Sequence, residues 1–367
     1  MIARAWRTPL GATIDGALAR LYAGERAAIT DPRGGYACAT IAPIHGEPAH
    51  SRQARFLGRM GLFGLEVAAE ALAASGLTGG PRIGVFCGVG GLRAHWEDMM
   101  AAFANQDDAG ARMWERGLKD VHPYWMLRHL SNNVHALASA TLELRGEGAT
   151  FGGANAGAQA IASASRALAD GAIDGALVVA YDSLLEPETL VELGARRSAT
   201  HAAADRVTAP YGSDAAGFVP GEAAAAIVLV REAAAPLAWI DARATTGDLD
   251  RCAAALAPGA TVIAGTARAW PDLDGAERVA LAALTGDAAL VAPSAAMGQL
   301  GAPTTVVQAI VLAEILRRGL LPPIAGLERP AAGPLRPVTR TIATDARIAL
   351  GVHLADPELA AAIRVEA

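Results

Sequence analysis

The feature that most limits the fold of this chain is a series of short apolar segments that alternate with longer segments of helical periodicity. The apolar segments lie at 82–87, 176–180, 223–230, 261–264, 289–292 and 347–350. They are short and end at turn residues, so we expect buried strands. Between them, segments such as Met60–Ser75 carry apolar residues at helical spacing. Buried strands that alternate with helices predict an α/β layered fold.

One motif, a turn followed by a helix, occurs twice along the chain. A Gly-rich turn feeds an apolar helix over Gly152–Leu168 and again over Gly298–Leu316, each time after a short strand. A duplication explains this repeat. We expect an N-terminal half at 1–235 and a C-terminal half at 236–367, joined at Ala233–Pro236.

The core of such a fold must be built mainly from small aliphatic side chains. Of the 367 residues, 52% are apolar and only 5% are aromatic, so Ala, Val and Leu must fill the interior. That apolar content is typical of a compact chain, and Ala-rich helices favour close layers. The formal net charge is -6 and no basic run is present, so a nucleic-acid partner is not expected.

The cysteines and the apolar runs indicate the compartment. Cys38, Cys87 and Cys252 are odd in number and lack metal-binding spacing, which argues against a disulfide framework and favours a reducing cytoplasm. The N-terminal segment has no apolar stretch of signal length, and no run reaches the roughly 18 to 20 residues of a membrane span. We expect a soluble cytoplasmic protein without a membrane span and without a cofactor or metal.

The turn at 152–157 is the first candidate site. A strand that turns sharply into a helix exposes the first helical residue, and the free amides of the helix can bind an oxyanion. The alternative is an ordinary tight turn with close packing. An acyl-transfer enzyme would carry a thiol or hydroxyl at its tip, where this chain has Ala154.

The segments after this turn carry a family resemblance. Gly171 stands seventeen positions after Ala154 and is followed by Ala-Ile-Asp-Gly-Ala-Leu-Val-Val-Ala, and further on comes the block Pro210–Val230. Together they resemble the β-ketoacyl synthases of the thiolase superfamily, whose equivalents read roughly ACSSS…G…D.ALAGG and PFD..RDGFV.GEGAGVLVL. The match runs from Arg82 to Val230 and resumes at 265–277 and 294–310, with its most specific part at 214–229. The resemblance implies a thiolase-like, duplicated five-layer αβαβα fold.

The catalytic groups of that family do not occur at the matching positions. The nucleophilic Cys of the family corresponds to Ala154, and its two His residues correspond to Ala264 and Gln299. A Lys five positions before the second His corresponds to Ser294. Without a thiolate or an imidazole there, the resemblance implies no acyl-enzyme and no general acid or base, so no catalytic residue is assigned.

Other parts of the family site are altered as well. The family's FGFGG loop gates the site and donates an oxyanion amide, and it corresponds here to 350–354, which places Val352 beside the elbow residues Ala154 and Asn155. The segment Ile240–Thr261 is short compared with the family, which argues against independent docking of an acyl carrier.

The remaining cysteines and histidines fit a structural role better. Cys87 ends a buried strand and is expected to be a small core residue. His122, His129, His135 and His353 do not fall on family His positions, so we expect them to be structural or exposed.

The family contains a silent relative of this kind. The chain length factor of type II polyketide synthases resembles the ketosynthase, lacks the Cys and forms a heterodimer with an active one. The resemblance therefore implies an active β-ketoacyl synthase as partner, an acyl carrier protein reached through the complex, and a role in polyketide, aryl polyene or fatty-acid-like biosynthesis. Candidate tunnel residues are Met99 and Phe103 on one helical face, and Met126 and Leu130 at the start of a second helix. The alternative for each is core packing.

Three other functions stay open. The chain could be an enzyme of another mechanism on this fold, for example a malonyl-thioester decarboxylase in which Asn155 or Gln299 stabilises an enolate. It could be a homodimeric scaffold that binds acyl groups. The least favoured is a ketosynthase with a displaced nucleophile.

Overall fold

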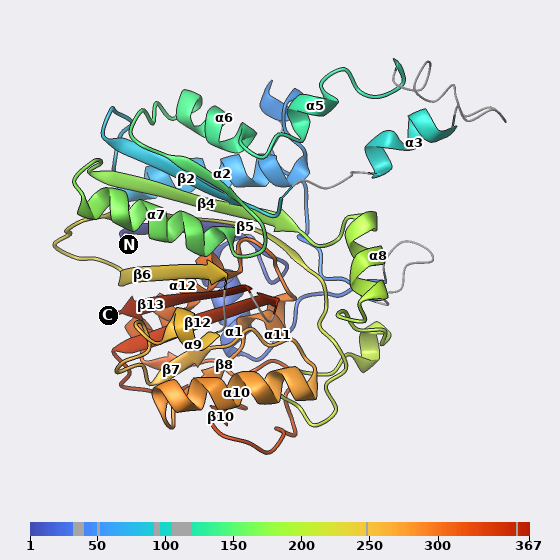
Figure 1. Ribbon diagram of the computed structural model, residues 1–367, viewed down its shortest axis with the longest axis vertical. Helices are drawn as coiled ribbons and strands as arrows, with labels where there is room; N and C mark the ends of the chain where they lie inside the picture. The colour runs from blue at the N-terminus through green and yellow to red at the C-terminus, as the bar shows by residue number, and fades with distance from the viewer. Residues whose placement is uncertain (32–39, 50–51, 92–95, 105–118, 247–248, 357–358) are drawn as a thin grey trace.

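The protein forms two β-sheets with helices between and outside them (Figure 1). The computed structural model describes residues 1–31, 40–49, 52–91, 96–104, 119–246, 249–356 and 359–367. The strands of the first sheet are β1 (Ala3–Arg7), β2 (Ile83–Val89), β3 (Ala149–Gly152), β4 (Gly175–Ser183) and β5 (Glu222–Val230). Those of the second sheet are β6 (Trp239–Thr246), β7 (Val262–Ala264), β8 (Ala289–Val291), β10 (Arg336–Pro337), β12 (Ile348–Asp356) and β13 (Leu359–Glu366). A separate pair joins β9 (Leu320–Leu321) and β11 (Ile342–Ala343).

The two sheets share one topology. Their orders are β1-β5-β4-β2-β3 and β6-β13-β12-β7-β8, with β10 added at the end of the second. In the first sheet, β3, β2 and β4 are parallel to one another, and β5 pairs antiparallel with both β4 and β1. In the second sheet, β8, β7 and β12 are parallel in the same way, and β13 pairs antiparallel with both β12 and β6. The duplicated architecture predicted from the repeated turn is therefore present. The division into 1–235 and 236–367 falls between β5 and β6 and remains a proposal.

The helices complete five layers (Figure 1). α2 (Arg59–Ser75) and α6 (Asn133–Thr141) cover the outer face of the first sheet, and α9 (Leu249–Ala253) and α10 (Pro271–Thr285) lie outside the second. α7 (Ala156–Ala169) and α12 (Thr304–Arg318) pack between the sheets. The other helices are α1 (Ile14–Tyr22), α3 (Trp96–Ala104), α5 (Trp125–Arg128), α8 (Pro187–Ala195) and α11 (Pro293–Met297). The predicted order αβαβα is thus observed.

Small side chains allow these layers to lie close together. In β4, Ala176, Val178 and Ala180 face the middle layer, whereas Leu177 and Val179 pack toward α2. The strand is buried on both faces, as its uninterrupted apolar sequence predicts. α12 is buried over thirteen successive residues, 304–316, because sheets cover it on both sides. Within the described ranges, no helix combines the length and apolar character that a bilayer crossing requires.

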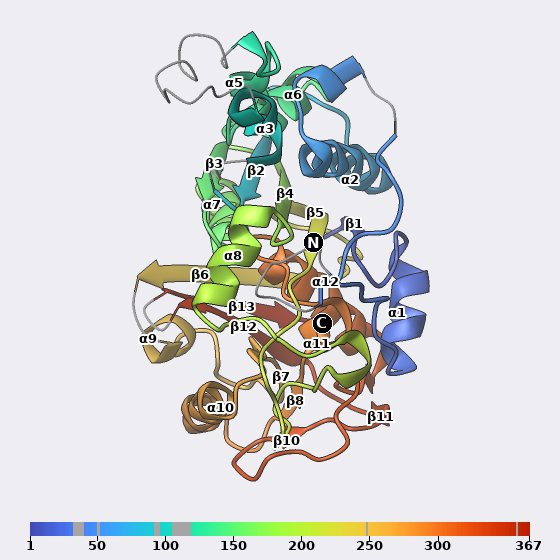
Figure 2. The same cartoon turned by 90° about the vertical axis from the view of Figure 1, so that its right-hand side faces the viewer.

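Two local expectations differ from the structure. The helix expected from Tyr124 onward is only the single turn α5, and Leu130 lies beyond its end, before α6 begins. The stretch 321–337 is rich in proline, and this composition predicts a surface loop with turns. In the structure it buries Leu321, Ile324 and Leu327, because it runs across the second half's core. Figure 2 shows α3 and α5 together at one end of the molecule, where His129 Nε2 lies 2.6 Å from Asp98 Oδ2.

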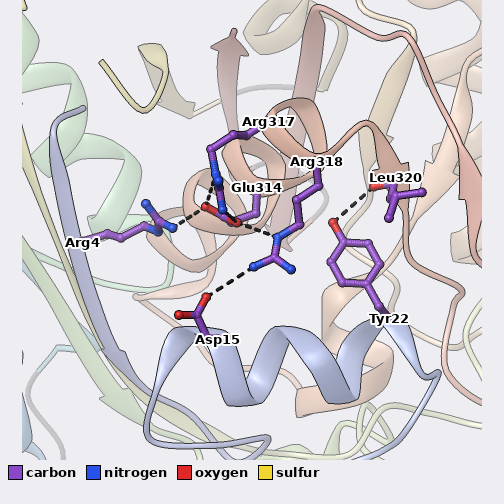
Figure 3. A network of polar contacts seen from close by, with 7 residues as sticks. All are labelled: Arg4, Asp15, Tyr22, Glu314, Arg317, Arg318 and Leu320. Carbon is purple, nitrogen blue, oxygen red and sulfur yellow. Dashed lines mark hydrogen bonds and ion pairs between the residues drawn. The ribbon is translucent and has the colours of Figure 1, made fainter. Parts of the chain in front are cut away.

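An ion-pair network fixes the middle layer to the N-terminal segment (Figure 3). Glu314 of α12 is buried, and its carboxylate accepts hydrogen bonds from Arg317 (2.7 Å), Arg318 (2.8 Å) and Arg4 of β1. Arg318 also reaches Asp15 of α1 at 3.3 Å. Burial favours the protonated acid, but the hydrogen bonds from Arg317 and Arg318 outweigh it and hold the pKa of Glu314 below its usual value.

Candidate functional site: the elbow between β3 and α7

The elbow predicted at 152–157 is formed as a sharp turn between β3 and α7. Gly153 has a φ of 110°, in the left-handed region that side chains other than glycine rarely adopt. Ala154 follows at the tip and is half-buried, and the helix starts at Ala156. The tip of the elbow therefore presents the methyl group of Ala154.

Two glycines let this helix approach its neighbours. A Cβ on Gly88 of β2 would lie 2.7 Å from the backbone carbon of Ala156 and the nitrogen of Gly157. Gly157 in turn packs against the turn before α12, and its N–H donates to Ala302 O at 3.2 Å. The elbow of the first half is thus held by the equivalent turn of the second half.

A cavity of about 1120 Å³ opens in front of the elbow. Ala154, Thr266, Gln299 and His353 line it, together with Arg268 and Trp270. These residues come from the elbow, the segment after β7, the turn before α12 and strand β12. The structure therefore brings Ala154 and Gln299 together, as their predicted roles require.

The other predicted positions lie behind this cavity wall. Ala264 is fully buried in β7, and Ser294 donates weakly to Thr266 O at 3.4 Å. Val352 is fully buried, and its carbonyl accepts a hydrogen bond from Gln308 at 2.9 Å. Asn155 is buried next to the tip. Their assignments as degenerate or oxyanion-like positions stay predictions.

Two hydrogen bonds from its side-chain amide hold Gln299 in place. It is buried, and its Nε2 donates to the carbonyl oxygens of Thr266 (2.6 Å) and Ala267 (2.9 Å). Both N–H bonds of the amide are used in this way. The side chain closes the wall of the cavity and binds the segment after β7 to the turn before α12.

His353 is a residue of this site that sequence reasoning missed. Its Nδ1 lies 2.8 Å from Asn155 Oδ1, and Asn155 Nδ2 donates to Leu359 O at 3.0 Å. Because Asn155 uses its amide N–H elsewhere, its oxygen accepts from the His353 Nδ1–H, which leaves a lone pair on Nε2. Burial, assisted by the positive charge of Arg268, lowers the pKa of His353 to about 4 and keeps the ring neutral. The one signal in the sequence was its position directly after Val352.

The predicted tunnel residues have different surroundings. Leu130 lines a second cavity of about 330 Å³, which also borders Gly90, Tyr181 and Asp182. Met99 on α3 is half-buried, whereas the Met126 side chain is 67% exposed. Phe103 belongs to α3, but its side chain lies outside the described residues. Of the three whose side chains the structure describes, Leu130 lines this cavity, and the tunnel assignment stays a prediction.

The two cysteines that the structure describes do not line the elbow cavity. Cys87 is fully buried in β2, and burial raises the pKa of its thiol to about 12. Cys252 is buried beside the carbonyls of Arg243 and Ala360, at 3.5 Å from each. Among the described residues, neither of these two lines the cavity. Cys38 falls outside the described ranges.

Comparisons with known proteins agree with this geometry. A comparison with curated protein sequences gave no match. Among solved structures, a β-ketoacyl synthase from Burkholderia phymatum STM815 has a TM-score of 0.84 at 19% identity, over 100% of this chain and 98% of that one. The ishigamide ketosynthase/chain length factor has a TM-score of 0.85 at 17% identity, again over 100% and 98%.

A third solved structure, a type II polyketide synthase acyl-carrier protein in complex with its ketosynthase bound to the hexaketide, has a TM-score of 0.80 at 14% identity, over 100% and 98%. At these identities the likeness concerns the fold alone, and it confirms the predicted thiolase-like architecture. The sequence model of the beta-ketoacyl synthase N-terminal domain matches residues 45–235. Because that match spans more than half of the 367 residues, the chain belongs to the beta-ketoacyl synthase family.

Proposed function

We propose that this chain is a non-catalytic ketosynthase-like subunit of the chain-length-factor type. It pairs with an active β-ketoacyl synthase and shapes the acyl-chain tunnel in polyketide, aryl polyene or fatty-acid-like biosynthesis. The observation that carries the proposal is Ala154 at the tip of a fully formed elbow, facing a cavity of about 1120 Å³. A methyl group there cannot hold an acyl chain covalently.

The polar groups around Ala154 also favour a silent site. A condensing or decarboxylating site needs hydrogen-bond donors aimed at a developing oxyanion. Gln299 already donates both amide N–H bonds to carbonyl oxygens of the chain. Gln299 therefore has no amide N–H bond left to offer an oxyanion.

The surface beside α3 and α5 supports a partner. Trp96, Met100, Met126, Leu127 and Leu130, the apolar cluster, are all more than two-fifths exposed. They gather at the end of the molecule where α3 and α5 meet. Large exposed apolar side chains that cluster are typical of interaction sites. The edge strand β3, which leads into the elbow, offers a second pairing surface.

Two of the similar structures suggest which partners this chain would have. One pairs a ketosynthase with a chain length factor, and another joins a ketosynthase to an acyl-carrier protein. In this proposal the carrier protein reaches the present chain only through the complex, and Leu130, Met99, Met126 and Phe103 contribute to the shared tunnel. A bulky side chain at the closed end of the tunnel would limit product length, because a longer acyl chain would overpack that end at a cost of about 1 to 3 kcal/mol.

The test is co-expression with a ketosynthase encoded beside this chain. We expect the two to co-purify as a heterodimer and to make long acyl products that neither makes alone. In that complex, Phe103→Ala should lengthen the products. A stable homodimer of this chain that ignores the ketosynthase would instead favour the acyl-binding scaffold.

The hydrogen-bonded pair of His353 and Asn155 favours one second candidate, a thiolase-fold decarboxylase. In it, a malonyl thioester would lose CO2, and the resulting enolate would take a proton from water to give the acetyl thioester. Release of CO2 from malonyl-pantetheine by the purified chain alone, abolished by His353→Ala, would establish this activity.

A further inference from the structure

Asp182, at the end of β4, lies in the wall between the two cavities. Its side chain borders the second cavity, whereas Gly301 borders the elbow cavity, and Gly90 borders both. The carboxylate sits so close to Gly90 and Gly301 that neither glycine has room for a Cβ. The three residues therefore form one continuous wall.

The carboxylate is held in this position from both halves of the protein. It accepts hydrogen bonds from its neighbour, the Ser183 N–H, at 2.8 Å and from the Ala302 N–H, in the turn before α12, at 3.1 Å. Only 4% of the residue is exposed. Because two backbone groups hold it, the side chain cannot swing aside without loss of buried hydrogen bonds.

Tyr181 reinforces the wall from the second cavity. Its ring lines that cavity and lies against Gly64 of α2, where a Cβ would be 2.9 Å from Tyr181 Cδ1. Tyr181 and Asp182 point to opposite faces of β4, so the ring covers the side of α2 and the carboxylate covers the side of the turn before α12.

We propose that Asp182 is a partition that stops an acyl chain in either cavity from passing into the other. The inference rests on the proposed function, because it takes an acyl chain as the ligand. An apolar chain that crossed the wall would have to displace the carboxylate or lie against it, and burial of a carboxylate beside methylene groups is unfavourable.

The partition would have two effects. An acyl group bound beside Ala154 stays within the elbow cavity and cannot continue past the wall toward Leu130. A growing chain that reaches Leu130 from a partner cannot enter the unused elbow of this subunit, so its length is set by the second cavity and the shared interface.

The test measures the binding of S-alkyl pantetheine thioethers of increasing chain length by titration calorimetry. For the native chain, affinity should rise with the first methylenes and then stay constant. For Asp182→Ala it should continue to rise by about fourfold per added methylene. Asp182→Ser, which keeps an acceptor for the two N–H groups, provides a second variant in case the first fails to fold. Thr285→Ala, at the end of α10 and in the lining of neither cavity, is the control and should keep the native plateau.

Two results would overturn the inference. One is a native affinity that rises with every methylene to the longest probe; the other is a plateau that both Asp182 variants share with the native chain. If none of the probes binds to any variant, the elbow cavity is not an acyl site and the inference is also wrong. Pairing with a ketosynthase is measured separately by co-purification, so the proposed function does not fail with it.

Discussion

At the tip of the elbow, the accessibility of one side chain can be measured directly. Ala154 is half-buried beside the large cavity, whereas Ala156, two residues on, is fully buried. We expect Ala154→Cys to react readily with iodoacetamide, because a thiol at a helix N-terminus has a lowered pKa. Ala156→Cys is the matched control and should react on the order of a hundredfold more slowly, since it requires local opening.

The same variant tests whether the surroundings are also inactive. Under the proposed function, Ala154→Cys should form no β-ketoacyl product with acyl and malonyl thioesters, because Ala264 and Gln299, at the positions proposed for the family's two imidazoles, supply no general acid or base. Equal labelling of the two cysteine variants would show that Ala154 does not face the cavity.

His353 should make stability depend on pH. The pKa of His353 is lowered from 6.5 to about 4 in the folded chain, so the unfolded chain binds more protons between these values. The free energy of unfolding should therefore fall as the pH drops from about 6.5 to about 4, by up to roughly 3 kcal/mol. Urea unfolding at several pH values should show this loss for the native chain and a smaller one for His353→Gln. Identical pH profiles would contradict the burial of a neutral ring.

At the scale of elements, the contact of α7 with β2 depends on Gly88. Gly88→Ala places a methyl group against the start of α7, and we expect a loss of about 1 to 3 kcal/mol from overpacking. Gly275→Ala is the matched control: it lies inside α10 with nothing within 4 Å of its Cβ. That change should instead stabilise the fold by about 0.5 to 1 kcal/mol. Thermal unfolding of both variants measures the contrast.

The network in Figure 3 should stabilise the packing of α12 against β1 and α1. Glu314→Gln keeps the shape but removes a buried carboxylate that three arginines share, so we expect a loss of about 2 kcal/mol. Arg317→Ala, whose side chain is half exposed, should cost less than about 1 kcal/mol. Chemical unfolding of the two variants would contradict this view if Arg317→Ala proved the more damaging.

At the scale of the whole molecule, the apolar cluster should be needed for association rather than for folding. Met126→Lys places a charge on a residue that is 67% exposed and should leave the midpoint of thermal unfolding unchanged. Association with the ketosynthase should weaken by at least about tenfold if the cluster belongs to the interface. Val279→Lys, equally exposed on α10, is the control and should bind normally. Co-purification and analytical ultracentrifugation distinguish the two variants.

The sequence predicted the interior of the fold better than its edges. β4 and β5 are apolar on both faces, and their positions followed directly from that pattern. The edge strand β1 was not expected, because it carries two arginines. The other edge strand, β3, was expected only from the turn that follows it, because its four residues are partly exposed. Edge strands form where a neighbouring strand offers hydrogen bonds, which local sequence does not encode.

The sequence by itself determined the layered fold, the duplicated turn and the alanine at position 154, because each depends on local pattern or residue type. Only the tertiary structure placed His353 against Asn155, which is 198 positions away, and Asp182 between Gly90 and Gly301. Contacts of this kind arise where separate elements pack, and their geometry depends on how the two halves meet. The methyl group at the tip of the elbow could therefore be read from the sequence, whereas the shape of the cavities beside it required the packed chain.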